Sequence, residues 1–209
     1  MPFQPPSPVS AGYPRRWLAV ASSTNDVARE WAKKGAPDGA VVVADHQTRG
    51  RGRRGRNWMS TPGKALCASF VLRPDWPADD AKRLAVLGGW AVYQALQRVG
   101  VPDLRIKWPN DVLSSGRKIS GVLVEPLIAR GRIEFAILGI GVNVQQEALD
   151  FPEELRSRAA SCRMLGGTCS VEMVLDYLVE ALAESRREPY EGVEARWKAA
   201  GADREATLE

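Results

Sequence analysis

The sequence predicts an α+β domain in which a mixed β-sheet is flanked by helices. Short apolar runs typical of strands gather in the middle of the 209-residue chain, and amphipathic stretches lie on either side of them. The composition, with 44% apolar and 26% charged residues, is that of a globular protein and argues against disorder or a fibrous repeat. The length fits one sizeable domain, expected at residues 15–209, after an irregular lead-in at 1–14 that contains five prolines.

The first elements are predicted from a helical pattern followed by a β-branched run. Ser23 and Asp26 have the spacing of a capping box, and Gly35 supplies a stop, so we expect a helix at residues 24–34. The continuous run of apolar residues at 40–44 indicates a strand that is buried on both faces.

Strand and helix signals then alternate along the rest of the chain. Asp79 or Asp80 is expected to cap a second helix, which Gly100 ends. Ser170 caps a third amphipathic helix, and a short helix is expected around Trp197. Further strands are predicted at residues 65–72, 104–108, 119–125 and 132–140.

Several classes of protein are disfavoured by composition. No run approaches the roughly eighteen apolar residues that span a bilayer, and the start of the chain lacks the order of a signal peptide, so we expect a cytoplasmic location. Three cysteines, Cys67, Cys162 and Cys169, are odd in number, lack metal-ligand spacing and are expected to be reduced thiols. The net charge of +4 is too small to indicate nucleic-acid binding.

A glycine–arginine segment is the most informative part of the chain. Five arginines fall within eight residues: Arg49, Arg51, Arg53, Arg54 and Arg56. Residues 50–55 satisfy the G-x-G-x-x-G pattern of dinucleotide-binding folds, but Pro62 and Gly63 preclude the helix which that fold requires. Arginine–glycine tails that bind nucleic acid are usually long and terminal, whereas this segment is short and internal. The composition favours a loop that closes over a compact anionic ligand, since glycine permits close approach and arginine donates forked hydrogen bonds.

Two more segments place polar residues at the ends of predicted strands. Residues 107–111, Lys-Trp-Pro-Asn-Asp, form either an ordinary turn or part of a site. Residues 139–143, Gly-Ile-Gly-Val-Asn, are compatible with a tight turn or with close approach of the backbone to a ligand. Lys118 precedes another strand and supplies a basic group that can meet the arginine segment.

Taken in this order, and together with Ser23-Thr24-Asn25, Gln47 and residues 117–121, these segments resemble the catalytic domain of biotin protein ligases over residues 22–200. The resemblance implies a class II aminoacyl-tRNA synthetase-like fold, which biotin and lipoate ligases share. It implies that biotin and ATP, with Mg²⁺, form biotinyl-5′-AMP, and that biotin then passes to a lysine of a biotin carboxyl carrier protein. It also implies a form without an N-terminal DNA-binding domain, hence no specific DNA and no membrane partner, and leaves a homodimer open.

The resemblance implies three overlapping sets of site residues and leaves the metal ligands unknown. The catalytic residues would be Arg53, Lys118 and Asp111. The biotin-binding residues would be Ser23, Thr24, Asn25, Gln47, Gly50, Arg51, Gly52, Arg53, Lys118, Gly121 and Gly139. The residues that bind ATP or the adenylate would be Arg51, Arg53, Trp58, Lys107, Asn110, Lys118 and Asn143.

Two features depart from the family pattern. Many relatives continue into a C-terminal SH3-like barrel, which we expect to be absent because the sequence ends at Glu209. Lys64 stands where mainly small residues or asparagine are expected, so the adjoining wall of the site is less well defined. Two alternatives remain open: a lipoate ligase, which shares the fold and the adenylation step, and a nucleic-acid-binding module.

Overall fold

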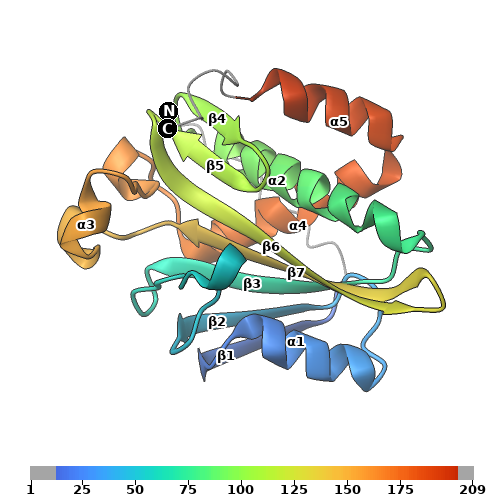
Figure 1. Cartoon of the computed structure of the whole chain (residues 1–209). Helices are drawn as coiled ribbons and strands as arrows, with labels where there is room; N and C mark the ends of the chain where they lie inside the picture. Colours follow the sequence, from blue (N-terminus) through green and yellow to red (C-terminus); the bar gives the residue numbers. More distant parts are fainter. Residues whose placement is uncertain (1–12, 202–209) are drawn as a thin grey trace, which may run out of the picture.

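The computed structural model describes residues 13–201, so nearly all of the predicted lead-in at 1–14 lies outside the described residues. A seven-stranded sheet with the order β1-β2-β3-β7-β6-β5-β4 runs through the domain (Figure 1). β1 and β2 are parallel, whereas all other neighbouring strands are antiparallel, so the sheet is mixed as predicted. The strands are β1 (Arg15–Ala21), β2 (Val41–Gln47), β3 (Ala65–Leu72), β4 (Leu104–Lys107), β5 (Asp111–Ser114), β6 (Arg117–Ala129) and β7 (Arg132–Asn143).

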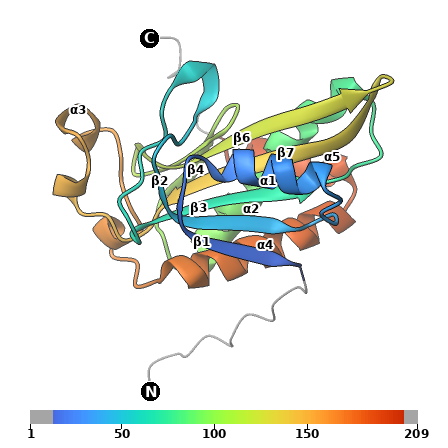
Figure 2. The same cartoon turned by 90° about the horizontal axis from the view of Figure 1, so that it is seen from below.

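Helices cover both faces of the sheet (Figure 2). One helix, α1, packs on one face over a small core that includes Val42, Val71, Phe135 and Ile137. The opposite face carries the main core, to which α2, α4 and α5 contribute. The helices are α1 (Thr24–Lys33), α2 (Ala81–Arg98), α3 (Glu153–Arg156), α4 (Val171–Arg187) and α5 (Tyr190–Ala199).

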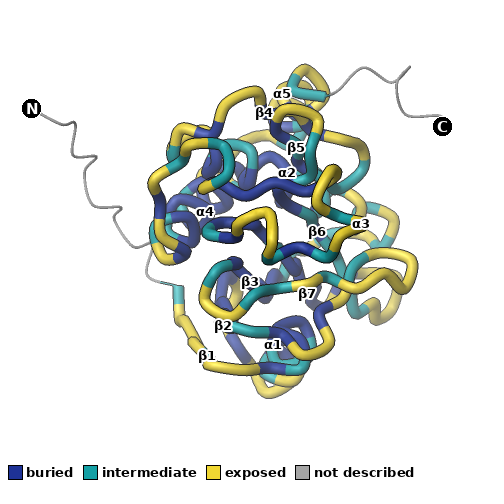
Figure 3. Tube along the Cα trace, turned by 90° about the vertical axis from the view of Figure 1, so that its left-hand side faces the viewer, coloured by how far each residue is buried: buried dark blue, intermediate teal, exposed yellow. Residues whose placement is uncertain are grey.

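Burial explains which strands the sequence revealed. All eight residues of β3 are buried, because this central strand is covered on both faces, and its apolar run predicted its bounds correctly. β1 is an edge strand that is exposed along most of its length (Figure 3), and it was not predicted even though residues 17–21 form a short apolar run. β5 was also missed, because its first residue, Asp111, belongs to the segment interpreted as a turn.

The two predicted helix caps have different outcomes. Ser170 caps α4 as expected, since its side chain accepts a hydrogen bond from the Met173 backbone N–H. The capping box at Ser23 and Asp26 is wrong: the Ser23 side chain caps no N–H of α1, and Asp26 is bonded instead to Arg51. In the part of the chain that the structure describes, no helix is long and apolar enough to cross a membrane.

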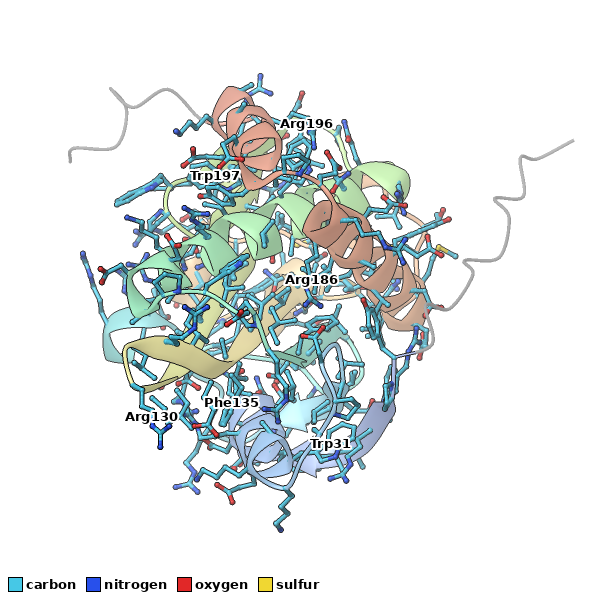
Figure 4. All side chains as sticks on the ribbon, turned by 90° about the vertical axis from the view of Figure 1, so that its right-hand side faces the viewer. Trp31, Arg130, Phe135, Arg186, Arg196 and Trp197 are labelled. Carbon is cyan, nitrogen blue, oxygen red and sulfur yellow. The ribbon has the colours of Figure 1, made fainter. Side chains whose placement is uncertain are left out.

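Helix α2 packs tightly against the sheet and α5 at two consecutive glycines. A Cβ atom at Gly88 would lie 2.9 Å from Leu138 Cδ1 and 3.1 Å from Val122 Cγ1, which are methyl groups of the sheet. At Gly89 a Cβ would lie 3.1 Å from Nε1 of Trp197, whose indole reaches from α5 towards α2 (Figure 4). Glycine therefore sets the distance between α2 and the layers beside it.

We expect Gly88→Ala to lower the free energy of unfolding by about 1–2 kcal/mol, because overpacking outweighs the better helix propensity of alanine. Gly192→Ala in α5 is the matched control, since a Cβ there has no neighbour within 4 Å. The control should raise the free energy of unfolding by about 0.5–1 kcal/mol. Urea denaturation of both variants provides the measurement, and equal stabilisation would show that the sheet accommodates the added methyl group.

Candidate active site

A pocket opens on the face of the sheet that carries α1, beside the N-terminus of that helix. Its floor includes glycines of β6 and β7, and its empty volume, including the open mouth, is about 470 Å³. Gly139 and Gly141 share the face of Phe135 and Ile137 in β7, because alternate residues of a strand point the same way. The lining residues are Ser23, Thr24, Asn25, Gln47, Arg51, Gly52, Arg53, Trp58, Ala68, Asn110, Lys118, Gly121, Val122, Leu123, Gly139, Ile140 and Gly141.

The glycine floor lets side chains from other elements lie directly on the sheet. A Cβ at Gly139 would be 2.3 Å from Asn25 Oδ1, and one at Gly141 would be 2.3 Å from Cε2 of the Trp58 indole. Both distances are far below van der Waals contact, so a larger residue at either position would displace the side chain above it. The glycines are therefore required by the packing of Asn25 and Trp58.

Buried and partly buried hydrogen bonds fix the polar end of the pocket. The Thr24 backbone N–H and hydroxyl donate to Gln47 Oε1 at 2.7 and 3.0 Å. The Ser69 hydroxyl donates to Asn25 Oδ1 at 2.5 Å, and Asn25 Nδ2 donates to Glu125 Oε2 at 2.9 Å. The start of α1 is thus bonded to β2, β3 and β6, and its polar side chains are oriented before any ligand binds.

The glycine–arginine segment folds back on itself above the sheet. The Gly52 N–H donates to the Arg56 carbonyl at 2.7 Å, and the Trp58 N–H donates to the Gly50 carbonyl at 3.0 Å. We refer to residues 50–58 as the glycine–arginine loop. These bonds turn the loop into a small hairpin, which lies in front of the sheet between β3 and β6 (Figure 1, teal).

The loop meets the Lys-Trp-Pro-Asn-Asp segment through Arg53. Arg53 Nη1 donates to Asn110 Oδ1 at 2.7 Å. Asn110 is held in turn by β6, since its Nδ2 donates to the Val122 carbonyl at 3.0 Å and its own carbonyl accepts from the Val122 N–H at 2.8 Å. Two motifs that lie 57 residues apart in the sequence therefore meet at the mouth of the pocket.

Lys118 is fixed by both its side chain and its backbone. Its Nζ lies 2.8 Å from Asp111 Oδ1 and 5.9 Å from the centroid of the Trp58 ring. Its backbone N–H donates to the Arg158 carbonyl at 2.8 Å, and its carbonyl accepts from the Ala160 N–H at 2.9 Å. The segment before α4 thus fixes the backbone of Lys118, while Asp111 and the Trp58 ring fix its ammonium group.

Arg51 is bound by two acids at the rim of the pocket. It donates two hydrogen bonds to the carboxylate of Asp26, at 2.8 and 2.7 Å, and its Nη2 lies 3.4 Å from Glu125 Oε1. The hydrogen bond to Arg51 holds the pKa of Asp26 below its ordinary value of 3.8, and the same pairing raises the pKa of Arg51. Both groups therefore remain charged throughout the neutral range.

Four of the residues expected in the site do not line the pocket. Gly50 is the first residue of the loop, and a Cβ there would be 2.4 Å from the Trp58 carbonyl oxygen at the other end of the loop. Lys107 is exposed at the end of β4, and Asp111 reaches the site only through Lys118. Asn143 is 4% exposed, and its Nδ2 donates to the Ala160 carbonyl at 2.9 Å, so its amide supports the segment that holds Lys118.

Sequence reasoning missed the residues behind the pocket wall. Ser69, Glu125 and Arg29 bond to one another or to Asn25, and none of the motifs contains them. Glu125 carried a usable signal, because it is the one charged residue in the otherwise apolar stretch 121–129 of β6. Ser69 carried little, since a serine in a buried strand is unremarkable until its partners are known.

The pocket does not supply an obvious metal site or nucleophile. In residues 13–201 no group of three or more histidine, cysteine, aspartate or glutamate side chains could hold a metal ion. Burial raises the pKa of the Cys67 thiol to about 11, so it remains protonated at neutral pH. His46 Nδ1 lies 3.1 Å from the Ser60 carbonyl oxygen, a contact that links two backbone segments. The charged and amide side chains that line the pocket are Arg51, Arg53, Lys118, Asn25, Gln47 and Asn110.

The mixed sheet, its helical layers and a pocket roofed by a cationic loop define a domain of the class II aminoacyl-tRNA synthetase-like fold. The chain belongs to the biotin/lipoate A/B protein ligase family, whose model matches residues 17–143. This match confirms the family resemblance that the motifs indicated. It covers α1, the glycine–arginine loop, β1 from residue 17 onward and all of β2 to β7.

Individual relatives agree with this assignment. The bifunctional ligase/repressor BirA of Bacillus subtilis (strain 168) is 43% identical over 148 residues, which are 71% of this chain and 46% of that protein. The biotin–[acetyl-CoA-carboxylase] ligase of Mycobacterium tuberculosis is 38% identical over 154 residues, or 71% of this chain and 54% of the relative. The chain thus spans about half the length of these curated relatives.

Solved structures show the same fold. A biotin protein ligase from Aquifex aeolicus, in complex with biotin and ATP, has a TM-score of 0.76 at 30% identity. The match covers 90% of this chain and 78% of the other. A biotin protein ligase from Leishmania major, in complex with biotinyl-5-AMP, has a TM-score of 0.77 at 23% identity. The match covers 94% of this chain and 84% of the other, and at this identity it supports the fold alone.

The pairing of Asp26 with Arg51 predicts a specific pH dependence. Because the pKa of Asp26 is lowered in the folded state, the pair stabilises the fold above the ordinary value of 3.8 and is lost as the pH falls through the lowered pKa. Carboxyl ¹³C NMR should show Asp26 titrating below 3.8 in the native protein and nearer 3.8 in Arg51→Met. Arg54→Met is the control, since Arg54 forms no ion pair within residues 13–201. Identical midpoints in all three proteins would contradict the pairing.

Proposed function

We propose that this chain is a biotin protein ligase, which forms biotinyl-5′-AMP from biotin and ATP and then transfers biotin to a lysine of a biotin carboxyl carrier protein. The observation that carries the proposal is the arrangement of the pocket in two rows across β6 and β7. Asn25 lies over Gly139, which pairs with Leu123. Lys118 and Trp58 lie over Gly121 and Gly141, which pair with each other.

The two rows are two residues apart along the strands, or about 7 Å. One end of the pocket therefore presents neutral hydrogen-bonding groups, and the other presents cations. Biotin has matching chemistry: a neutral ureido ring at one end and a carboxylate at the end of an aliphatic chain. Ser23, Thr24 and Gln47 would bind the ureido ring, Leu123 would contact the aliphatic chain, and Lys118 would meet the carboxylate.

The first half-reaction needs positive charge where these residues supply it. The biotin carboxylate attacks the α-phosphate of ATP, a P–O bond forms, and pyrophosphate leaves with the electrons of the broken P–O bond. Two anions must approach each other, so fixed cations lower the barrier. Lys118 and Arg53 would stabilise the developing charge on the phosphate, while Trp58 and Asn110 would lie beside the nucleotide.

Magnesium would enter with the nucleotide. Mg²⁺ in ATP sites is usually held by substrate phosphates and one or two carboxylates, so the absence of a three-ligand cluster in the described residues is compatible with Mg-ATP as the substrate. Asp111 is the carboxylate nearest to Lys118 in this structure. No step depends on a metal ion held by the protein alone.

The second half-reaction makes an amide from a mixed anhydride. The carrier lysine attacks the biotinyl carbonyl as a free amine, the C–O bond to phosphate breaks, and AMP leaves. An amine with an ordinary pKa near 10.4 is protonated at neutral pH, so a nearby base must orient it or accept its proton. We assign this role to Asp111, which must then exchange its ion pair with Lys118 for contact with the incoming amine.

Mass spectrometry of a biotin carrier domain, incubated with the protein, Mg-ATP and either biotin or lipoate, tests the proposal. We expect one lysine to gain the mass of a biotinyl group, with no change in the lipoate reaction. Modification by lipoate alone would identify a lipoate ligase. If both reactions leave the domain unmodified and release no pyrophosphate, the proposal is wrong.

Lys118→Ala should slow pyrophosphate release by about two to three orders of magnitude, because it removes a fixed cation from the site of phosphoryl transfer. The fold should survive, since the Lys118 side chain is 37% exposed and its backbone bonds do not involve the ammonium group. Lys33→Ala, which removes a surface partner of Glu30 on α1, is the control and should leave the rate unchanged. An unchanged rate in Lys118→Ala would refute the assignment.

Asp111→Ala should impair the second half-reaction more than the first, because its partner there is the acceptor amine. Single-turnover transfer from preformed biotinyl-5′-AMP should slow by about a hundredfold, the usual contribution of a general base. Pyrophosphate release should change much less. Transfer at the wild-type rate would exclude Asp111 as the group that handles the amine.

A further inference from the structure

The arginines of the glycine–arginine loop differ in their partners, and this difference separates their roles. Arg51 is bound by the carboxylates of Asp26 and Glu125. Arg53 has a neutral partner, the Asn110 side-chain oxygen at 2.7 Å. An arginine that already shares two carboxylates gains less from an anionic ligand than an arginine bonded to an amide.

The charges around Arg51 also balance without a ligand. Glu125 Oε2 accepts a hydrogen bond from Arg29 Nη2 at 2.8 Å, so the cluster contains two acids and two arginines. We call Asp26, Arg29, Arg51 and Glu125 the rim cluster. A substrate anion that recruited Arg51 would have to break its bidentate bond to Asp26 and leave that carboxylate uncompensated. The cluster is therefore better suited to hold the loop than to bind the anion.

The rim cluster joins three elements that surround the pocket. Asp26 and Arg29 belong to α1, Glu125 belongs to β6, and Arg51 is the second residue of the loop. Glu125 also accepts from Asn25 Nδ2 at 2.9 Å, so the same carboxylate that approaches Arg51 orients an amide in the pocket wall. The side chain of Glu125 is only 22% exposed, which limits the competition from water.

We propose that Asp26 and Glu125 are positioning residues that act through Arg51 to dock the glycine–arginine loop against α1 and β6, and that Arg51 itself does not bind the substrate anion. Docking at Arg51 fixes the start of the loop and thereby presents Gly52 and Arg53 to the pocket. The activity measurements below rest on the proposed function, whereas the structural measurement does not.

Limited trypsin digestion of the ligand-free protein tests the docking directly, because the loop itself carries trypsin sites at Arg53, Arg54 and Arg56. Asp26→Asn and Glu125→Gln should each increase the rate of cleavage at these sites about three- to tenfold, the effect of losing a partly exposed bidentate or networked ion pair. Asp26→Glu should restore protection. Glu30→Gln is the matched control, because it removes an acid that pairs with Lys33 on the outer side of the same helix.

The lifetime of bound biotinyl-5′-AMP distinguishes docking from anion binding, because the two roles predict opposite changes in the acid variants. If the acids act through Arg51, Asp26→Asn and Glu125→Gln should speed dissociation of the adenylate about three- to tenfold. If Arg51 binds the anion, these substitutions free it from competing carboxylates and should slow dissociation. A double-mutant cycle adds a second readout: Asp26→Asn should have little further effect once Arg51→Met is present.

The outcomes separate the two proposals. Wild-type loop cleavage in both acid variants, a longer adenylate lifetime, or additive effects of Asp26→Asn and Arg51→Met would each overturn the docking role. If the wild-type protein forms no adenylate at all, the proposed function fails, while the trypsin comparison still decides whether the rim cluster docks the loop. The expected result is faster cleavage and a shorter adenylate lifetime in Asp26→Asn and in Glu125→Gln, with values close to wild type in Asp26→Glu.

Discussion

The site depends on an open stretch of sheet surface where β6 and β7 carry glycine in place of side chains. Because the backbone is bare at Gly139 and Gly141, the side chains of Asn25 and Trp58 can lie on it. The start of α1, the glycine–arginine loop and Lys118 therefore meet above the same short segments of β6 and β7. A β-carbon at either position would occupy the space that Asn25 or Trp58 fills, so the glycines of the sheet determine the geometry of the pocket.

Electrostatics gives the site its second constraint. A pocket built to bring a carboxylate and a phosphate together must hold several cations close to one another, and unpaired cations repel. In this structure Arg51 is balanced by Asp26 and Glu125, and Lys118 by Asp111, whereas Arg53 is bonded to the neutral Asn110. The acids thus reduce the repulsion between these cations when no ligand is bound. Arg51 and Lys118 are paired with carboxylates, whereas Arg53 has no carboxylate partner among the described residues and remains available to an anion.

Hydrogen bonds between segments that are distant in the sequence position the residues of the site. Lys118 depends on the backbone of Arg158 and Ala160, and Asn143 supports that segment instead of facing the pocket. The assignment of Asn143 to the nucleotide therefore remains a prediction that the geometry does not favour in this state. Lys64, which departs from the family pattern, bonds to Asp150 at 2.8 and 2.9 Å and ties the loop after β7 to the start of β3. Lys64 therefore forms an ion pair outside the residues that line the pocket.

The sequence by itself determined the central strands, the main helices and the family, because buried strands such as β3 and amphipathic helices such as α4 leave clear apolar patterns. It also identified most of the residues that line the pocket, because the glycine–arginine and Lys-Trp-Pro-Asn-Asp motifs are contiguous segments that can be recognised without the fold. Only the tertiary structure decided the edge strand β1, whose residues are mostly exposed, and the true partner of Asp26. Capping of α1 and pairing with Arg51 are equally compatible with an aspartate at position 26, and only the distance across the fold selects between them. The roles of Ser69 and Glu125 were hidden for the same reason: their hydrogen bonds to Asn25 join β3 and β6 to α1, and only the packing of α1 on the sheet brings these segments together.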